Sequence, residues 1–232
     1  MGTFGGGKLE KIKAIIFDLD GTLYDLDDTV GIYYAMEVEF MKGYLHKTEN
    51  EVKAFLQENG VLPYRSEKAQ SATDLFLRIG VPKSEWVTYR EANFDVSGID
   101  EEKAASAEIV AGFSEIAPIY LLSSNTYGNI ARILGKIGIE PALFERVICS
   151  DRSPCKGLFT KKEVMESLCR ELDLSPSELF SIGDRYHTDV EPLLELGGVG
   201  VVIKEPHSLS ALLSDLKNGA LQTCDAYTFC EK

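Results

Sequence analysis

Two aspartates that directly follow a short apolar run are candidates for a catalytic or metal-binding role. Residues 13–18 are rich in β-branched and aromatic side chains and end in Asp18, and Asp20 follows two positions later. Such a run is typical of a buried strand, and open parallel sheets bind ligands at the carboxyl ends of their strands. Two neighbouring carboxylates suit a nucleophile with a proton-transfer group, and they also suit a hard cation. Gly21 and Thr22 permit a turn there, although an isolated acidic pair is more often a surface turn.

Polar residues of suitable types also follow two further apolar runs. Ser124 and Asn125 open a helical pattern after one of them, and backbone N–H groups at the start of a helix bind anions. Asp184 follows the other run, and Asp189 lies five residues further on. Each group alone is typical of a helix cap or a turn. Three strand ends that all carry residues suited to magnesium and phosphate predict one functional site.

The pattern of the chain indicates how these residues are positioned. Apolar runs that predict buried strands lie at residues 13–18, 119–123, 147–149, 179–182 and 199–203. Helical patterns separate them, at residues 126–137, after Thr160, after Ser175 and at 188–196. Strands that alternate with helices predict a parallel sheet covered on both faces, which is an α/β, Rossmann-like core.

An insert of residues 28–117 interrupts this alternation and contains no convincing strand. Apolar stripes at helical spacing predict a helix from Val30, and a capping-box pattern at Thr48 predicts a second. Further helices are expected at residues 66–79 and 101–113. The expected organisation is a flexible tail of residues 1–12, a core of residues 13–27 and 118–221, a helical domain of residues 28–117, and a tail of residues 222–232.

Composition and charge narrow the class of protein. The chain has 232 residues, 44% of them hydrophobic and 26% charged, which is ordinary globular usage. Its net charge of −13 argues against nucleic acid polymers and anionic membrane surfaces as partners, and no apolar run is long enough to cross a bilayer. Five cysteines without a CxxC pair favour a reducing, cytoplasmic location. An anionic substrate would need local positive charge from a cation, a lysine or helix N-termini.

The motifs, taken in order, resemble those of the haloacid dehalogenase (HAD) superfamily. The stretch DLDGTLY that begins at Asp18 is similar to the first motif, and Ser124-Asn125 is similar to the second. The stretch GDRYHTD that ends at Asp189 is similar to the fourth. The resemblance spans about residues 13–203, and its first and fourth motifs are highly specific together.

Two residues fit the third motif of the family, a lysine near the start of a helix. Lys161 begins a predicted helix, whereas Lys156 lies in the loop before it. In the family this lysine pairs with the nucleophile and with the charge of the phosphate. Both residues stay candidates, and Lys161 is narrowly preferred.

The resemblance implies phosphoryl chemistry through a phosphoaspartate. Asp18 is then the nucleophile, and Asp20 protonates the leaving oxygen and later deprotonates the attacking water. The HAD dehalogenases lack this second aspartate, so its presence favours a phosphatase. Ser124 and the backbone N–H of Asn125 are expected to hold phosphoryl oxygens, together with the Gly21-Thr22 turn.

The same resemblance implies Mg²⁺ as the cofactor. Its expected ligands are the Asp18 carboxylate, the backbone carbonyl of Asp20 and the Asp184 carboxylate, with Asp189 completing or supporting the site. The ion would neutralise charge on the phosphoryl oxygens.

The helical insert resembles the family's C1 cap, in the branch that contains phosphoglycolate phosphatases and pyrimidine nucleotidases. The expected substrate is a small phosphorylated metabolite: a nucleoside monophosphate, phosphoglycolate or a sugar phosphate. The alternatives are a phosphomutase of the same superfamily and a non-catalytic binding protein that keeps the fold. We expect a monomer or a homodimer. Tyr24, Tyr64 and Trp86 are candidates to face the substrate, although aromatic residues in such positions are more often core.

Overall fold

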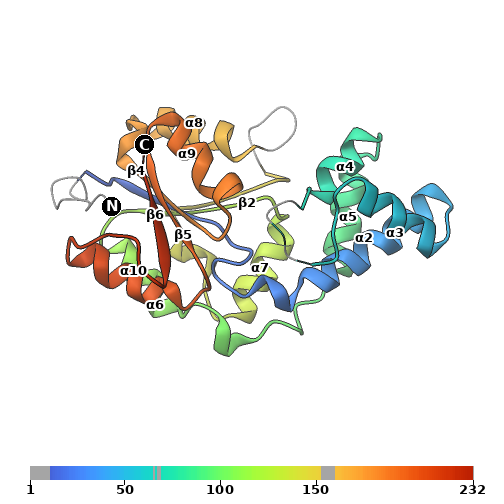
Figure 1. Cartoon of the computed structure of the whole chain (residues 1–232), viewed down its shortest axis with the longest axis horizontal. Helices are drawn as coiled ribbons and strands as arrows, with labels where there is room; N and C mark the ends of the chain where they lie inside the picture. The colour runs from blue at the N-terminus through green and yellow to red at the C-terminus, as the bar shows by residue number, and fades with distance from the viewer. Residues whose placement is uncertain (1–10, 65, 67–68, 153–159, 232) are drawn as a thin grey trace. The chain divides into compact units, whose positions relative to one another are not determined.

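The computed structural model describes residues 11–64, 66, 69–152 and 160–231. The chain divides into two compact units, one formed by Met1–Asp25 with Asp100–Lys232 and the other by Leu26–Ile99 (Figure 1). The first unit contains the sheet and the second is helical. Within the described residues, no helix is both long and apolar enough to span a membrane.

The sheet has six strands in the order β3-β2-β1-β4-β5-β6. The strands are β1 (Ala14–Phe17), β2 (Ile119–Ser123), β3 (Arg146–Cys149), β4 (Leu179–Gly183), β5 (Val199–Ile203) and β6 (Tyr227–Cys230). Neighbouring strands from β3 to β5 pair in parallel, whereas β5 and β6 are antiparallel. The α/β, Rossmann-like core predicted from the sequence is therefore confirmed. Because β1 lies between β2 and β4, the residues after these three strands share one edge of the sheet.

Residues 222–232, expected to be a C-terminal tail, include strand β6. Tyr227 is fully buried, and its hydroxyl donates a hydrogen bond to Asp215 Oδ2 at 2.5 Å. Only Tyr227 of its four residues is buried, so the run does not stand out as apolar in the sequence, and the strand is specified by its pairing with β5. Cys224 and Cys230, at this end of the chain, are free thiols.

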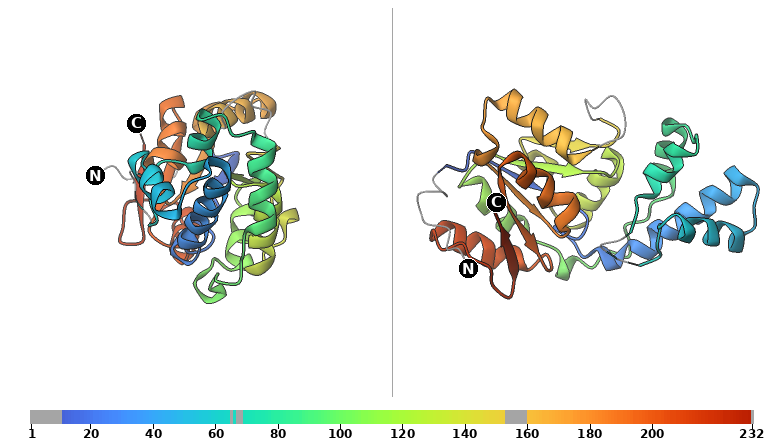
Figure 2. Two further views of the ribbon diagram at one scale, coloured as in Figure 1. Left: turned by 90° about the vertical axis from the view of Figure 1, so that its right-hand side faces the viewer. Right: turned by 45° about the horizontal axis from the view of Figure 1, so that its top comes forward.

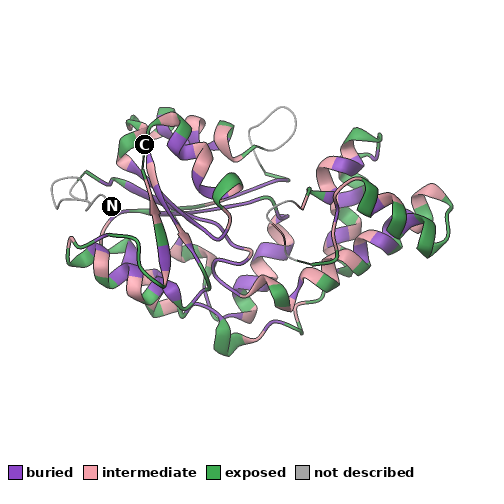
Figure 3. Ribbon diagram, in the orientation of Figure 1, coloured by how far each residue is buried: buried purple, intermediate pink, exposed green. Residues whose placement is uncertain are grey.

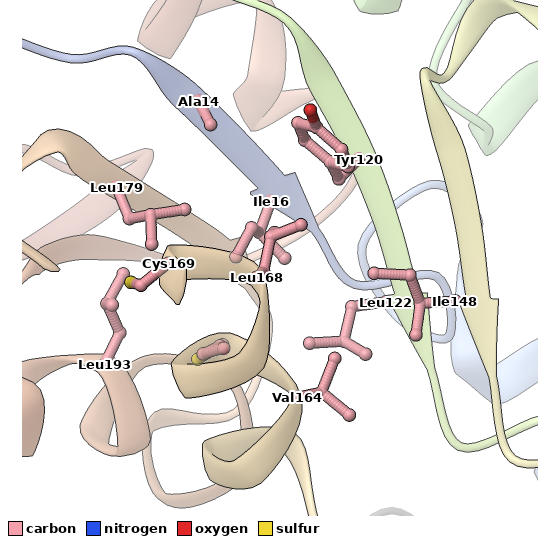
Figure 4. Packing of buried hydrophobic residues seen from close by; sticks show 11 residues of the cluster. Ala14, Ile16, Tyr120, Leu122, Ile148, Val164, Leu168, Cys169, Leu179 and Leu193 are labelled. Carbon is pink, nitrogen blue, oxygen red and sulfur yellow. The ribbon is translucent and has the colours of Figure 1, made fainter. Parts of the chain in front are cut away.

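Helices cover both faces of the sheet, as Figures 1 and 2 show. They are α6 (Ala107–Ser114), α7 (Tyr127–Lys136), α8 (Lys161–Leu172), α9 (Glu191–Leu196) and α10 (Ser208–Lys217). Side chains alternate along a strand, so Ile16 of β1 packs toward α8 (Figure 4). Phe17 points to the other face and contacts Phe113 of α6 in an edge-to-face pair. The cluster beneath α8 joins Ile16 to Leu122 of β2 and Leu168 of the helix.

The helical unit holds α2 (Val30–Leu45), α3 (Glu49–Glu58), α4 (Ala72–Arg78) and α5 (Lys83–Asn93). The capping box predicted at Thr48 is present. The helix expected at residues 66–79 is shorter, because Ser71 caps α4 through a bond from the Asp74 N–H. Helix α5 has no counterpart among the sequence predictions. Its Trp86 packs on Phe40 of α2 with ring centroids 4.9 Å apart, and both side chains are buried. Buried and exposed segments alternate along the helices of this unit (Figure 3).

Residues 100–117 group with the sheet rather than with the helical unit in which they were expected. A Cβ atom added to Gly112 of α6 would collide with Leu213 of α10, so these two helices are in close contact. The helix expected at residues 101–113 is divided into a 3₁₀ turn, η2 (Glu101–Lys103), and α6, since Ser106 caps a new helix by accepting from the Ile109 N–H. The pattern after Ser175 likewise forms only a 3₁₀ turn, η4 (Pro176–Glu178).

Candidate active site

The loop after β1 turns back on itself and keeps Asp18 and Asp20 at the sheet edge. The Asp18 N–H continues the strand ladder to the carbonyl of Ile182, at 2.9 Å. The Gly21 N–H then donates to the Tyr24 carbonyl at 3.1 Å, and Asp20 and Tyr24 form an isolated bridge. Gly21 has a φ of +87°, and a Cβ atom there would collide with the Asp184 carboxylate. The turn anticipated at Gly21 therefore needs glycine for its backbone angle and for space.

Three carboxylates gather at the ends of β1 and β4. Asp18, Asp184 and Asp189 are all buried, and each offers an oxygen atom within 4.8 Å of the others. Buried carboxylates that lie this close repel one another unless a cation is shared between them. The arrangement is suited to a hard divalent cation, which prefers oxygen ligands.

Lys161 supplies positive charge to this carboxylate cluster. It is the first residue of α8, and its Nζ atom forms ion pairs with Asp18 Oδ1 and, at 2.8 Å, with Asp189 Oδ1. The Thr160 hydroxyl caps the helix by accepting a hydrogen bond from the Glu163 N–H, and this cap makes the helix begin at Lys161. Lys156, the other candidate for the third motif, lies outside the described residues.

The charges in the cluster shift one another's protonation. Burial raises the pKa of Asp18, and the carboxylates of Asp189, Asp184 and Asp20 act in the same direction, against Lys161. Burial opposes the charge of Lys161, but Asp18 and Asp189 outweigh it and raise the lysine pKa above its usual value. Burial also opposes ionisation of Asp189, yet the bonds from Lys161 and from the Arg185 N–H lower its pKa. Lys161 therefore stays an ammonium ion, and Asp189 stays a carboxylate.

Asp189 is held by the turn that follows β4. This turn is π-helical, η5 (Tyr186–Val190), so the helix expected at 188–196 begins only at Glu191. The Arg185 N–H donates to Asp189 Oδ2 and the Thr188 hydroxyl to Oδ1, both at 2.9 Å. A Cβ atom on Gly183 would collide with Asp189, so glycine lets the aspartate lie against the strand end. Widened helical turns of this kind are frequent at functional sites.

Asp20 is in a different environment from Asp18. It is half-buried, and two hydroxyl groups donate hydrogen bonds to its carboxylate. Tyr24 Oη donates to Oδ1 at 2.6 Å, and Ser123 Oγ donates to Oδ2 at 3.2 Å. Asn125 Nδ2 also lies 3.5 Å from Oδ1. Two carboxylates in different surroundings are suited to different roles.

In the second motif the structure places Ser123, rather than the predicted Ser124, against Asp20. Ser124 is exposed, whereas Ser123 is fully buried and contacts Asp20. The N–H of Asn125, expected to hold a phosphoryl oxygen, donates to Ser123 Oγ at 3.0 Å in this structure. Strand alternation predicts that Ser123 and Ser124 point to opposite sides, but it does not say which of them meets Asp20, because both faces of β2 are buried.

The Asn125 side chain is part of a chain of hydrogen bonds along α7. Its Oδ1 accepts from the Thr126 N–H at 3.0 Å and from Asn129 Nδ2 at 3.2 Å. Asn129 is fully buried, and its own Oδ1 accepts from Arg132 at 2.5 Å. Because Arg132 and the backbone N–H can only donate, both amide orientations are fixed and the Asn125 amide nitrogen faces Asp20.

The remaining candidates are distributed over the two units. The Thr22 hydroxyl lies 3.5 Å from Asp18 Oδ2 and is fully buried. Tyr24, considered as a substrate contact, is also fully buried and directs its hydroxyl to Asp20. In the helical unit Trp86 is a core residue whose indole N–H donates to Thr73 at 2.9 Å, whereas Tyr64 is 58% exposed.

The sequence and the fold are similar to those of known hydrolases. A family model of haloacid dehalogenase-like hydrolases matches residues 12–197. Among solved structures, a HAD phosphatase from Thermococcus onnurineus has a TM-score of 0.54 at 16% identity, over 83% of this chain and 86% of that chain. A predicted phosphoglycolate phosphatase from Haemophilus somnus 129pt has a TM-score of 0.53 at 16% identity, over 84% and 86% of the two chains.

A third structure, the HAD-hydrolase YfnB from Bacillus subtilis bound to magnesium, has a TM-score of 0.51 at 14% identity, over 88% and 99% of the two chains. At these identities the likeness shows a shared fold. No curated protein matches the sequence.

The family model matches the part of the chain that contains the candidate site. Residues 12–197 include the aspartates after β1, the polar end of β2, Lys161 and the aspartates after β4. They also make up most of the chain. The chain therefore belongs to the haloacid dehalogenase-like hydrolase family.

Proposed function

We propose that the chain is a magnesium-dependent phosphatase that hydrolyses a small phosphorylated metabolite through a phosphoaspartate on Asp18. The observation that carries this proposal is the contrast between the two aspartates after β1. Asp18 is buried and ion-paired with Lys161, whereas Asp20 is half-buried and bonded to hydroxyl groups. A nucleophile and a proton-transfer group need this kind of difference.

The donor set fits Mg²⁺. Asp18, Asp184 and Asp189 bring three buried carboxylates within 4.8 Å of one another, and hard oxygen donors are the ligands that Mg²⁺ prefers. Lys161 contacts two of the three, so negative charge predominates among these four groups. Bound there, the ion would neutralise charge on the phosphoryl oxygens. The magnesium in the YfnB structure supports this assignment by analogy of fold.

In the first proposed step, a carboxylate oxygen of Asp18 attacks phosphorus. A bond forms between this oxygen and phosphorus, and the ester bond from phosphorus to the leaving oxygen breaks. The leaving oxygen takes a proton from the carboxyl group of Asp20 and departs as an alcohol. Lys161, which stays charged, offsets negative charge at Asp18 and on the phosphoryl group.

In the second step, the Asp20 carboxylate removes a proton from a water molecule as it attacks the phosphorus of the phosphoaspartate. The bond between phosphorus and Asp18 breaks, which frees inorganic phosphate and restores the Asp18 carboxylate. Asp20 is again protonated, so the cycle closes without a further reactant.

The proposed substrates are nucleoside monophosphates, phosphoglycolate and sugar phosphates, with the helical unit as the part that selects among them. The name of the Haemophilus structure supports phosphoglycolate as one member of the test panel. A phosphomutase is the alternative on the same scaffold, because it would use the same first step and return the phosphoryl group to a sugar.

The test is phosphate release from this panel, with Mg²⁺ and with chelator, by wild type and Asp18→Asn. Asp225→Asn is the matched control, because it makes the same change at an exposed aspartate beside the edge strand β6, two strands away from β4. We expect magnesium-dependent release that Asp18→Asn abolishes and Asp225→Asn retains. Release that survives in Asp18→Asn would refute the proposal, and an isomeric sugar phosphate in place of free phosphate would favour the mutase.

A further inference from the structure

The carboxylate of Asp20 accepts hydrogen bonds from two hydroxyl groups that belong to different elements. Tyr24, in the loop after β1, reaches Oδ1 at 2.6 Å, and Ser123, at the end of β2, reaches Oδ2 at 3.2 Å. Both donors are fully buried, although Asp20 itself is half-buried. A carboxyl group held at both oxygens has its plane fixed as well as its position.

Backbone hydrogen bonds hold Tyr24 next to Asp20. Asp20 and Tyr24 face each other across a tight turn, closed by the bond from the Gly21 N–H to the Tyr24 carbonyl. The Leu23 N–H bonds back to the Leu19 carbonyl at 2.9 Å, and the Leu23 carbonyl accepts from the Ala105 N–H at 2.9 Å. The turn is therefore anchored inside the sheet unit, and the phenol has little freedom to move away from Asp20.

A phenol is chemically suited to hold a group that gives up and regains a proton. A hydroxyl can donate to a carboxylate and accept from a carboxylic acid, whereas a lysine or arginine can only donate. Tyr24 can thus keep its contact throughout the cycle in which Asp20 passes a proton to the leaving oxygen. Lys161 contacts other carboxylates, those of Asp18 and Asp189.

We propose that Tyr24 is a positioning residue that, together with Ser123, orients the carboxyl group of Asp20 for proton transfer to the leaving oxygen. This inference rests on the proposed phosphatase function. Tyr24 then acts in the first step through Asp20, rather than by contacting the substrate.

The test uses the dependence of the rate on the leaving group. An alkoxide is a poor leaving group and needs the proton from Asp20, whereas p-nitrophenolate leaves readily without one. The measurement is the single-turnover rate at which Tyr24→Phe releases the leaving group, an alcohol from the best alkyl phosphate of the metabolite panel or p-nitrophenol from p-nitrophenyl phosphate. Release of the leaving group reports the first step alone, whereas Asp20 acts on both esters alike in the second step. General acid catalysis contributes about 10²–10⁴-fold, so partial misplacement of Asp20 is expected to slow the alkyl ester about tenfold. The aryl ester is expected to change less than about twofold, and the KM of both to stay nearly constant.

The matched control is Tyr227→Phe. Tyr227 is fully buried and bonds to Asp215 at 2.5 Å, so this variant loses the same kind of tyrosine–aspartate bond at the β6 edge. It should leave the ratio of the two rates unchanged. Ser123→Ala is the second test, because it removes only one buried oxygen atom and is expected to shift the ratio in the same direction as Tyr24→Phe.

Three results would overturn the inference. Equal slowing of both esters by Tyr24→Phe, or the same ratio as in Tyr227→Phe, would show a purely structural role. If Tyr24→Phe does not fold, an unchanged ratio in Ser123→Ala would refute the shared positioning role. Wild-type inactivity toward every ester would refute the proposed function and the inference with it, which is distinguishable from an active wild type whose ratio is insensitive to both changes.

Discussion

Lys161 is expected to hold the carboxylate cluster together, so its replacement should be costly for the fold as well as for activity. Lys161→Met keeps most of the side-chain volume and removes the ammonium group. The side chains of Lys161 and Asp18 are only 12% and 9% exposed, and that of Asp189 is 3% exposed, so solvent does little to replace the lost charge. Removing one partner of a buried ion pair typically costs about 3–5 kcal/mol. For a unit of this size, that corresponds to a fall in Tm of roughly 10 °C in chelator.

The neighbouring residue provides the control. Lys162 pairs with Glu195 at 2.7 Å, but these side chains are 44% and 45% exposed. An exposed pair contributes about 0–1 kcal/mol, so Lys162→Met should be close to wild type. Calorimetry or far-ultraviolet circular dichroism should follow the transition, because the single tryptophan, Trp86, lies in the helical unit and its fluorescence would report that unit instead.

The pH dependence of this loss has a defined sign. Burial raises the pKa of Asp18 in the folded protein, and loss of the Lys161 charge raises it further. A carboxyl group whose folded pKa is raised destabilises the fold above that pKa, and the cost disappears as the pH falls through it. The difference in Tm between Lys161→Met and wild type should therefore shrink on acidification. A Lys161→Met protein as stable as Lys162→Met at pH 8 would refute the reasoning.

Two further predictions concern Glu37 and Asp184. Burial raises the pKa of Glu37 to about 8, against the opposing charge of Arg90, so the stability of the helical unit should fall as the pH rises from about 5 to 8. Urea titrations followed by Trp86 fluorescence check this, and the same slope in Glu37→Gln would contradict it. Asp184→Asn removes one of three clustered carboxylates and should weaken Mg²⁺ binding at least about tenfold in calorimetric titration, whereas an unchanged affinity would exclude Asp184 as a ligand.

The sheet was predictable because its strands are long enough and apolar enough to be recognised one at a time. The run at 119–123 became β2 with the expected bounds, since all five of its residues are buried. Strand β6 was missed because only Tyr227 of its four residues is buried, so its burial pattern depends on the neighbouring strand. Helix α5 was missed because Trp86 and Arg90 are its only buried residues, and an arginine is not counted as core.

The structure brings Asp18, Asp184 and Asp189 of the predicted site together, but their contacts could not be predicted from the sequence. Motif order identified the aspartates, because their types and positions along the chain are sufficient. It preferred Lys161 to Lys156 only narrowly, because both are suitably spaced and the contact of Lys161 with Asp18 depends on where α8 starts. It could not find the role of Tyr24, since the contact with Asp20 depends on the tight turn at Gly21.

The central claim, a phosphoryl group carried on Asp18, has a direct chemical test. Wild-type protein turning over its best substrate with Mg²⁺ is quenched in acid and treated with borohydride, which reduces an acyl phosphate to an alcohol. Mass spectrometry of the peptide that contains residues 13–24 should then find homoserine in place of aspartate at position 18, dependent on substrate and unaffected by Asp225→Asn. Phosphate release by an active enzyme that leaves Asp18 unmodified at every quench time, or that modifies Asp20 instead, would contradict the account.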